Sequence, residues 1–336
     1  MDLSIIIVNY NSAHHVINCI GSILESSMQM KYEIIVVDNA SDKKDHEIVV
    51  GKYPSVKWIQ LDYNAGFARA NNAGIKSSIG EYILLLNADT LIKENAIEKV
   101  FQKFSTQEKY VACGVQLLNS DGTHQHSGAK FIKGGTNILL PLPYMGVFVK
   151  YMANQFQVKQ PNVFSVDKDA DVDWIVGAFI LTKRKHIERA GLLDEDFFMY
   201  AEEIEWCSRL RKLGPMVLFA EMDIIHLGGG SSSSYYKVKE YDNSNDLWST
   251  KAKQIIVSQM LRVRKQWGVF WYVFNLFMYF LEIPVFLVAV LFDNLLHGER
   301  AKHSFAQFKG YIKNMISAIP YFVDIFLNKH RFYKVW

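Results

Sequence analysis

The chain has few cysteines, and the pattern near residue 1 leads us to expect no signal peptide. Its 336 residues include three cysteines, Cys19, Cys113 and Cys207. An odd number of widely spaced cysteines offers neither a disulfide framework nor a Cys-x-x-Cys metal site, so we expect reduced thiols in a cytosolic compartment. Residues 1–8 end in a short apolar run. They have neither the basic region nor the longer apolar stretch of a signal peptide. We therefore expect the catalytic part to stay inside the cell.

Net charge is also small, but it is unevenly distributed. The formal net charge is +3. Residues 1–225 contain 23 Lys+Arg and 27 Asp+Glu, whereas residues 226–336 contain 14 and 7. Since half of the chain is apolar and 14% is aromatic, we expect a large core and no extended disorder. The acidic front and the basic, apolar rear predict two parts that face different surroundings.

Short apolar runs alternate with segments of helical period in the first part of the chain. The strand-like runs are Ser4–Val8, Glu33–Val37, Val56–Leu61, Tyr82–Leu86 and Tyr110–Gln116. The helical segments include His14–Ser26, Ala68–Ser78 and Glu94–Phe104. This alternation predicts an α/β fold with a mostly parallel central sheet that is buried on both faces. In such sheets, ligands bind beyond the carboxyl ends of the strands.

Polar clusters follow three of these strands, at Asn9–Asn11, Asp38–Asp42 and Asn87–Asp89. Asn, Asp and Ser also form turns and helix N-caps, which is the alternative for each cluster. Three clusters on one edge predict a crescent that can hold a polar ligand. Asp89, close to the amide oxygen of Asn87, suits Mg²⁺ or Mn²⁺ that is also bound by substrate phosphates.

Six separate segments agree in their order and spacing with one family pattern. They are Ser4–Asn11 (SIIIVNYN), Val36–Asp42 (VVDNASD), Asn64–Ile75 (NAGFARANNAGI), Leu84–Thr90 (LLLNADT), Asp173–Gly177 (DWIVG) and Gly191–Gly214 (GLLDEDFFMYAEEIEWCSRLRKLG). They resemble the family 2 glycosyltransferases, and most of all bacterial rhamnosyltransferase-like members, over residues 1–230. The resemblance implies a nucleotide-diphospho-sugar transferase domain of the GT-A fold that inverts the anomeric carbon.

The resemblance also implies a site for the nucleotide-sugar. Asn9 and Asp38 would hold the base and the ribose, Gly66 would permit close backbone approach, and Arg69 would reach phosphate. A solvated helix residue is the alternative for Arg69. The full predicted set is Asn9, Asp38, Asn39, Ser41, Asn64, Gly66, Arg69, Asn72, Asn87 and Asp89.

The metal site follows from the same resemblance. The family motif is often Asp-x-Asp, whereas here its first position is Asn87. Asp89 is therefore the expected ligand of Mg²⁺ or Mn²⁺, and His226 is implied to contact the metal or the diphosphate. A structural histidine is the alternative for His226. The Gly/Ser-rich stretch 228–234 is flexible by composition and could close over the sugar donor.

An acidic segment contains the predicted base. The residues with inward-facing helical spacing are Tyr200, Ile204, Cys207 and either Leu210 or Arg211. Glu202 and Glu203 are adjacent, so they point about 100° apart on a helix. In the related proteins the second acid is the general base on the acceptor hydroxyl, which implies Glu203 as the base and Glu202 as the next candidate. The clustered acids should raise one another's pKa, although a solvated acidic helix start is the alternative.

Two further features concern the acceptor. Trp174 and Gly177 are implied as borders of the acceptor pocket, with a core tryptophan as the alternative. His124 and His126 follow a turn signal at Asn119–Gly122. We expect these histidines at the surface near the acceptor rather than in a metal site.

The rear of the chain contains a long apolar segment. Val269–Phe292 is apolar except for Asn275, Glu282 and Pro284, and its length would allow it to span a bilayer. A charge and a proline near its middle oppose this, and the basic flanks place both ends in the cytoplasm. We predict two short helices, hinged at Pro284, that dip into the inner face of the membrane, with Tyr311–Leu327 as a second interfacial segment. A helical dimer interface is the alternative.

These features predict three regions and one activity. Residues 1–230 would form the GT-A catalytic domain, residues 231–266 a flexible loop and connecting helix, and residues 267–336 a helical membrane-associating region. The predicted reaction is inverting, metal-dependent, non-processive transfer of a sugar, such as rhamnose, from a UDP- or dTDP-sugar to a lipid-linked saccharide. The enzyme would serve cell-envelope polysaccharide biosynthesis (O-antigen or capsule type) at the cytoplasmic face of the cell membrane. A homodimer stays open, and no nucleic-acid partner is expected.

Other functions agree less well with the sequence. A nucleotidyltransferase that makes a nucleotide-sugar would need a glycine-rich, basic phosphate loop, and Asn9–His15 contains neither Gly nor Lys/Arg. A processive synthase would need several membrane spans and a Gln-x-x-Arg-Trp signature, where this chain has Arg264–Trp267. A sugar-binding or scaffold protein would not explain Asp89 and Glu203 together. A soluble dimeric glycosyltransferase with a non-lipid acceptor stays open.

Overall fold

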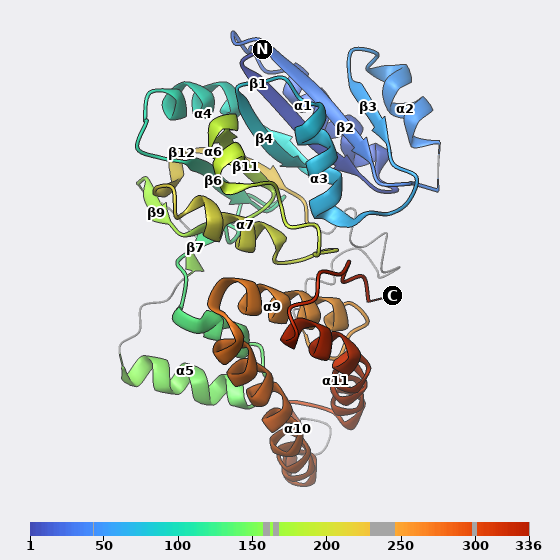
Figure 1. The fold of residues 1–336 in the computed structure, drawn as a ribbon, viewed down its shortest axis with the longest axis vertical. Coiled ribbons are helices and arrows are strands. Elements are labelled where there is room, and N and C mark those ends of the chain that lie inside the picture. The colour runs from blue at the N-terminus through green and yellow to red at the C-terminus, as the bar shows by residue number, and fades with distance from the viewer. Residues whose placement is uncertain (43, 157–161, 164–167, 229–245, 298–300, 336) are drawn as a thin grey trace. The chain divides into compact units, whose positions relative to one another are not determined.

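The computed structural model describes residues 1–42, 44–156, 162–163, 168–228, 246–297 and 301–335. The chain divides into two compact units (Figure 1). Unit 1 contains Met1–Lys130, Asn162–Phe198 and Glu202–Asn243, and unit 2 contains Phe131–Pro161, Met199–Ala201 and Ser244–Trp336. The predicted division at residues 230 and 266 is drawn by function rather than by compactness, and it stays a prediction.

Unit 1 is built on a mixed, mostly parallel sheet. In hydrogen-bonding order its strands are β3 (Lys57–Gln60), β2 (Tyr32–Asp38), β1 (Leu3–Asn9), β4 (Tyr82–Asn87), β11 (Phe179–Lys183), β6 (Ala112–Leu118), β12 (Met216–His226) and β5 (Thr90–Ile92), with β9 (Ala170–Val172) paired to β12. β1 is parallel to β2 and β4, and β6 is parallel to β12, whereas β11 is antiparallel to β4 and β6. A smaller sheet contains β10 (Trp174–Ile175), β7 (Gly128–Ala129) and β8 (Asn162–Val163). The predicted α/β fold is confirmed.

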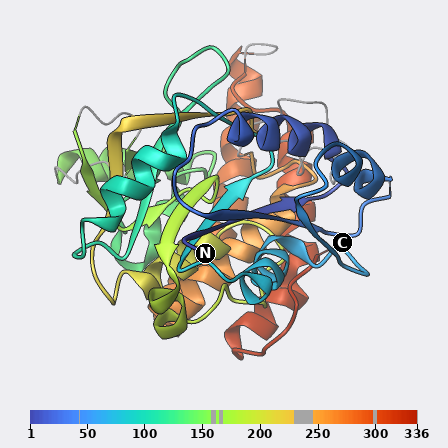
Figure 2. The ribbon, with the colours of Figure 1, turned by 90° about the horizontal axis from the view of Figure 1, so that it is seen from above.

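Helices cover both faces of the main sheet. They are α1 (Ala13–Leu24), α2 (Asp45–Lys52), α3 (Gly66–Ser77), α4 (Ala96–Ser105), α6 (Arg184–Ala190) and α7 (Glu202–Leu210). Successive strand residues point to opposite faces, so Ile5 belongs to one core cluster with Val16 of α1. Ile6 belongs to the other cluster with Ala68 of α3 and Trp206 of α7. Figure 2 shows α1 and α3 on opposite sides of the sheet, and this cover explains why the strands are continuous apolar runs.

Unit 2 is helical in its described residues. It contains the 3₁₀ segment η1 (Lys133–Leu139), α5 (Met145–Gln155), α9 (Ala252–Trp267), α10 (Val269–His297) and α11 (Phe305–Phe326), and α11 covers most of the second predicted interfacial segment. α9, α10 and α11 pack against one another. Buried hydroxyls connect α10 with α11. The Tyr272 hydroxyl donates to the Phe322 carbonyl, and the Tyr311 hydroxyl donates to the Tyr279 carbonyl, each at 2.7 Å. These bonds hold the helices together because buried polar groups must be paired.

α10 is one helix that continues through Pro284, so the predicted pair of short helices is wrong. A proline inside a helix removes one backbone hydrogen bond and costs about 3 kcal/mol. Contacts on both sides of the proline offset this cost. On one side, the buried Glu282 carboxylate accepts hydrogen bonds from backbone N–H groups of Tyr144 and its neighbour at the start of α5, at 2.9 and 2.8 Å. On the other, Phe286 packs edge-on against Phe308, with ring centroids 5.4 Å apart.

Candidate active site

The carboxyl ends of three parallel strands bring residues from distant parts of the sequence together. Asn9 of β1 pairs with Asp38 of β2, and Val8 of β1 pairs with Asn87 of β4. Parallel strands end at a common edge of the sheet, which is where α/β proteins bind ligands. The predicted polar clusters therefore lie along one edge of the sheet of unit 1.

Asn9 and Asp38 form the buried centre of this edge. The Asn9 amide donates to Asp38 Oδ1 at 2.6 Å and to Asp45 Oδ2 at 2.9 Å. The Ser41 hydroxyl donates to Asp38 Oδ1, and the Gln60 amide donates to Asp38 Oδ2, each at 2.6 Å. These bonds hold the Asp38 carboxylate in one orientation at the strand end. Sequence reasoning missed Asp45 and Gln60, although an acid in the first turn of α2 was a signal for Asp45.

Asn39, directly after β2, contacts the loop that leads from β3 into α3. The Asn39 amide donates to Asn64 Oδ1 at 3.0 Å, and Asn39 Oδ1 accepts from the Ala65 N–H at 2.7 Å. Gly66 has φ of 76°, and a Cβ at this position would lie 2.1 Å from the carbonyl oxygen of Phe198. Gly66 is thus required by the close approach of the Phe198 backbone. Its predicted approach to a ligand stays a prediction.

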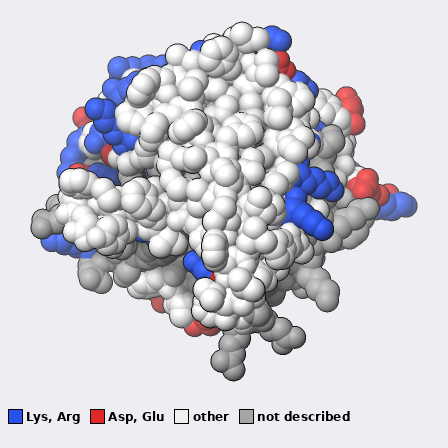
Figure 3. Space-filling view, turned by 90° about the horizontal axis from the view of Figure 1, so that it is seen from below, with Lys and Arg blue, Asp and Glu red and all other residues white. Residues whose placement is uncertain are grey.

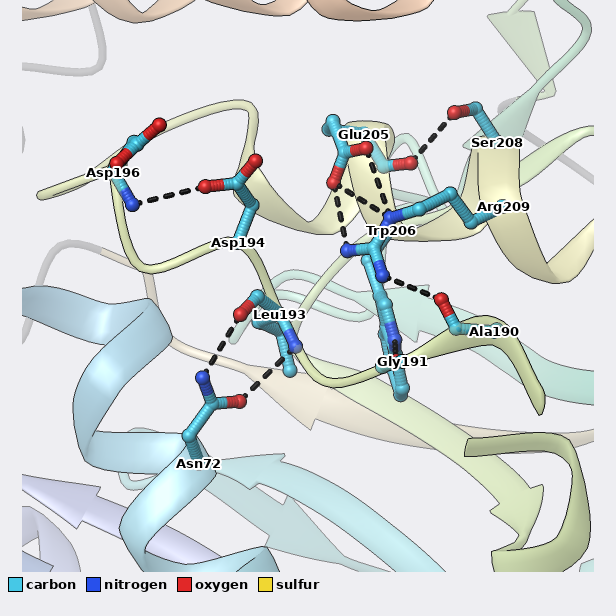
Figure 4. Close-up of polar contacts among 10 residues, drawn as sticks. All are labelled: Asn72, Ala190, Gly191, Leu193, Asp194, Asp196, Glu205, Trp206, Ser208 and Arg209. Carbon is cyan, nitrogen blue, oxygen red and sulfur yellow. Dashed lines mark hydrogen bonds and ion pairs between the residues drawn. The ribbon is translucent and has the colours of Figure 1, made fainter. Parts of the chain in front are cut away.

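Arg69 and Asn72 of α3 bind the loop that precedes α7. The Asn72 amide donates to the Leu193 carbonyl at 2.8 Å and accepts from the Leu193 N–H at 3.0 Å (Figure 4). Arg69 Nε donates to the Glu195 carbonyl at 2.9 Å. Burial raises the pKa of the Glu195 carboxyl, but hydrogen bonds from Asn72 and Lys76 bring that pKa below its ordinary value. Both predicted sugar-donor residues therefore position this loop, and their contact with a nucleotide-sugar stays a prediction.

The same loop fixes α7 (Figure 4). Trp206 Nε1 donates to the Gly191 carbonyl at 2.9 Å. Arg209 donates to both carboxylate oxygens of Glu205, at 2.8 to 3.1 Å, and to the Ala190 carbonyl at 2.7 Å. A bidentate charged pair has a defined geometry as well as an attraction. These contacts hold the helix whose first turn contains the two predicted catalytic acids.

Glu202 and Glu203 lie in different environments. Glu202 is 3% exposed, and burial, followed by the charge of Glu203, raises the pKa of its carboxyl well above the ordinary value. The predicted rise in pKa is therefore found for Glu202, with burial as its larger cause. Glu203 is half-buried, and a Cβ at Gly177 would lie 3.6 Å from Glu203 Cγ. Tyr200 and Ala201, directly before the helix, have φ of 72° and 67°, a strained conformation that is common at functional sites.

Asp89 and His226 are brought together by the pairing of β5 with β12. His226 is opposite Thr90 in this register, and the Leu227 N–H donates to the Asp89 carbonyl at 2.9 Å. His226 Nε2 lies 3.4 Å from Asp89 Oδ1 and 3.4 Å from the Asn87 amide nitrogen. The Asp89 and His226 side chains are 9% and 15% exposed. The predicted metal residues therefore face one another at the sheet edge.

A divalent cation agrees with this pair of side chains. In the part of the chain that the structure describes, no group of three or more His, Cys, Asp or Glu residues could hold a metal ion. Two ligand atoms side by side on an octahedral Mg²⁺ lie about 3 Å apart, which is close to the 3.4 Å between Asp89 Oδ1 and His226 Nε2. Mg²⁺ keeps several waters and is often bound by only one or two carboxylates together with substrate phosphates. The residues therefore fit a site that is completed by a diphosphate.

Comparisons with known proteins decide the class of enzyme. Residues 4–167 match the family model described as glycosyl transferase family 2. The chain thus contains a family 2 glycosyltransferase domain. It is 28% identical over 216 residues to the low-salt glycan biosynthesis hexosyltransferase Agl10 of Haloferax volcanii. This alignment covers 63% of this chain and 62% of the relative. It is also 22% identical over 240 residues to the N-acetylglucosaminyl-diphospho-decaprenol L-rhamnosyltransferase of Mycobacterium tuberculosis, over 67% of this chain and 75% of the relative.

The fold of this glycosyltransferase is also found among solved structures. The crystal structure of GalNAc-T7 with UDP, GalNAc and Mn²⁺ matches with a TM-score of 0.55 and 12% identity, over 96% of this chain and 57% of the other. This likeness confirms the GT-A fold. The chain aligns with about three fifths of the length of the Haloferax relative (62%).

The remaining predicted residues of the glycosyltransferase lie around β10. Trp174 is half-buried and meets the ring of His126 edge-on, with centroids 5.1 Å apart. Between His124, which is exposed, and His126 lies Gln125, whose amide contacts His226. Sequence reasoning missed Gln125 because a glutamine in a hairpin has no pattern of its own. Most of the predicted mobile stretch 228–234 lies outside the described residues.

Proposed function

We propose that this glycosyltransferase moves a sugar, such as rhamnose, from a UDP- or dTDP-sugar to a hydroxyl of a lipid-linked saccharide. The reaction inverts the anomeric carbon, depends on Mg²⁺ or Mn²⁺ and is not processive. The name of the mycobacterial relative, which states rhamnose transfer to a lipid-diphospho-saccharide, supports the substrate class. Assembly of cell-envelope polysaccharide of the O-antigen or capsule type is the process that consumes such products.

One observation carries the proposal: a backbone hydrogen bond in unit 1 joins the segment of the proposed metal ligand Asp89 to the segment beside the proposed base Glu203. The Asn87 N–H, two residues before Asp89, donates to the Ala178 carbonyl at 3.1 Å. Ala178 follows Gly177, which lies beside Glu203. A diphosphate near Asp89 and an acceptor hydroxyl near Glu203 would thus be held close together, as direct transfer between them requires.

The chemistry follows from these positions. The Glu203 carboxylate takes the proton of the acceptor hydroxyl. At the same time, the oxygen of that hydroxyl attacks the anomeric carbon from the side opposite the diphosphate. The bond between that carbon and the diphosphate oxygen breaks, and the configuration inverts. Burial, followed by the charge of Glu203, raises the pKa of the Glu202 carboxyl, which disfavours a second negative charge in this turn. A divalent cation held by Asp89 and His226 would neutralise charge on the departing diphosphate.

The surface of unit 2 supports attachment to the inner face of the membrane. The view in Figure 3 shows a broad area without charged side chains, with Lys and Arg toward its edges. Exposed side chains of α10 include Phe270 (71%), Phe277 (60%) and Phe292 (60%). The sequence of unit 2 contains 15 Lys+Arg and five Asp+Glu. An apolar face with a basic rim fits an anionic bilayer surface.

We propose that α10 lies in the membrane surface rather than across the bilayer. By length and composition it is the one described helix that could cross. One side of it, however, is committed to unit 2: Tyr272, Tyr279 and Glu282 are buried there. A crossing helix would have to give up these contacts and expose a carboxylate to lipid. A soluble dimer that pairs the same faces, with a non-lipid acceptor, is the competing outcome.

The activity is tested by turnover of the sugar donor. Purified protein is given Mn²⁺ or Mg²⁺, a panel of UDP-, dTDP- and GDP-sugars, and a short-chain lipid-diphospho-N-acetylglucosamine, and release of nucleoside diphosphate is measured. We expect metal-dependent release from one UDP- or dTDP-sugar, lost in Asp89→Ala. Product stereochemistry is read by NMR. Retention of configuration, or release that is unaffected by chelation of the metal, would contradict the proposal.

A further inference from the structure

Gln125 has one possible amide orientation. Its nitrogen donates to Asn119 Oδ1 at 2.7 Å and to the His226 carbonyl at 2.6 Å. An amide nitrogen has two hydrogens, and both are used. Reversal of the amide would place its oxygen against two other carbonyl oxygens at these distances. The Gln125 oxygen must therefore point elsewhere, and it lies 2.9 Å from His226 Nδ1.

This orientation determines the tautomer of His226. Because Gln125 Oε1 has lone pairs and no hydrogen, Nδ1 of the imidazole must be the atom that donates. In a neutral imidazole the other nitrogen is then an acceptor. That atom, Nε2, faces Asp89 Oδ1 and the Asn87 amide nitrogen, each at 3.4 Å.

The hairpin that presents Gln125 is itself fixed. The Gln125 N–H donates to the Leu117 carbonyl at 2.8 Å. At the turn, the Gly122 N–H donates to the Asn119 carbonyl at 2.9 Å, and Gly122 has φ of 82°. In the main sheet, Leu118 at the end of β6 is opposite Ile225 of β12. The residue before His226 is thus held beside the strand that leads into the hairpin.

We propose that Gln125 is a positioning residue that sets His226 as a metal ligand through Nε2. It fixes the imidazole tautomer by accepting the Nδ1 proton, and it holds the backbone by donating to the His226 carbonyl. Ligating histidines generally use their second nitrogen in this way, and loss of the outer partner weakens metal binding by about 10- to 100-fold. The inference rests on the proposed metal site, and it adds a residue that does not touch the metal.

The first readout is the tautomer of the His226 imidazole. Long-range ¹H–¹⁵N NMR spectra of labelled protein without metal report which imidazole nitrogen has the proton, with the His226 signals assigned by their loss in His226→Gln. We expect the Nδ1-protonated form in the wild type, where Gln125 supplies the acceptor. We expect its loss in Gln125→Met. Ser120→Ala, an exposed change at the turn of the same hairpin, is the control and should leave the His226 signals unchanged.

Metal binding provides the second readout. Mn²⁺ is titrated into each variant with and without UDP, and free Mn²⁺ is measured by electron paramagnetic resonance. We expect binding about 10- to 100-fold weaker in Gln125→Met and near wild type in Ser120→Ala. An unchanged tautomer in Gln125→Met, or a changed tautomer with unchanged Mn²⁺ affinity, overturns the inference. Equal Mn²⁺ binding by wild type and Asp89→Ala would instead overturn the proposed metal site, which the NMR result does not depend on.

Discussion

The two units of this glycosyltransferase distribute charge in opposite ways. By sequence, unit 1 contains 22 Lys+Arg and 29 Asp+Glu, whereas unit 2 contains 15 and five. The acids of unit 1 meet polar partners at a sheet edge, as Asp38 does with Asn9. In unit 2, Glu282 caps the start of α5, and Asp324 pairs with Arg331. Unit 1 thus has carboxylates at its sheet edge, whereas unit 2 has an excess of basic residues.

Apolar side chains show the same contrast. Among the described residues, unit 1 has five exposed large hydrophobic side chains and the smaller unit 2 has 21. Scattered exposed hydrophobic residues are normal, but gathered ones mark an interaction surface. The difference teaches that one chain combines two designs: a sheet unit with few exposed large hydrophobic side chains, and a helical unit with many of them.

The largest effect on the comparison of the two units is expected when a carboxylate is removed from the candidate active site of unit 1. We expect Glu203→Gln to lower kcat by about 10²- to 10⁴-fold, because a positioned base contributes on this scale. Glu202→Gln should retain most of the activity, since Glu202 is buried and its burial raises the pKa of its carboxyl, which disfavours the charged form that a base needs. Both variants are compared for nucleoside diphosphate release at saturating acceptor. The opposite ranking would make Glu202 the base.

The fold was predictable because both faces of the main sheet are covered. Buried parallel strands are continuous apolar runs, and the run Ser4–Val8 lies within β1 (Leu3–Asn9). The place of β11 between β4 and β6 was not predictable, since pairing between distant strands has no local signal. Pro284 shows the same limit in unit 2: propensity alone predicts a break, and the tertiary contacts of Glu282 and Phe286 override it.

The site was predictable only in its strand-end residues. Asn9 and Asn87 follow buried runs, and such ends gather at one edge of a sheet. Gln125 and Gln60 were missed because their roles arise from a hairpin and from a neighbouring strand, and neither has a motif. Asn72 belongs to a family motif, yet its amide is used by the backbone of Leu193. Sequence identifies the place of the chemistry better than the side chains that orient it.

The outward face of α10 offers the next largest effect. We expect Phe277→Asp with Leu291→Asp to weaken binding to phosphatidylglycerol vesicles by more than about 10-fold. Burial of each side chain in lipid is worth about 1.5–3 kcal/mol. Ile79→Asp in unit 1, at a side chain that is 70% exposed, is the matched control and should not change flotation with the vesicles. Unchanged flotation of the double variant, together with a dimer in sedimentation that it dissociates, would favour the soluble dimer.

Ion pairs of the two units should differ in strength. We expect Glu205→Ala to lower the free energy of unfolding of unit 1 by about 1–3 kcal/mol, because it leaves the partly buried Arg209 without its bidentate partner. Asp324→Ala in unit 2 should cost less than about 1 kcal/mol, since its partners Lys329 and Arg331 are 56% and 43% exposed. Urea unfolding of each variant measures both values. Equal costs would mean that burial does not set the strength of these pairs.

Acid provides the smallest and most selective comparison, because each unit contains a histidine whose pKa is lowered. Burial, followed by the charges of Lys185 and other basic neighbours, lowers the pKa of His186 in unit 1 from 6.5 to about 4, and burial lowers that of His303 in unit 2. Between pH 6.5 and 4 the unfolded chain binds a proton at His186 that the folded unit does not, so stability falls as the pH falls. We expect His186→Gln to remove about 1 kcal/mol of this loss, less than the full linkage value because water screens the exposed charges around the ring. His303→Gln should act in the same direction on unit 2. Urea unfolding from pH 7 to pH 4.5, with separate probes for sheet and helix signals, assigns each change to a transition. Changes that both fall on a single transition would show that the two units unfold as one.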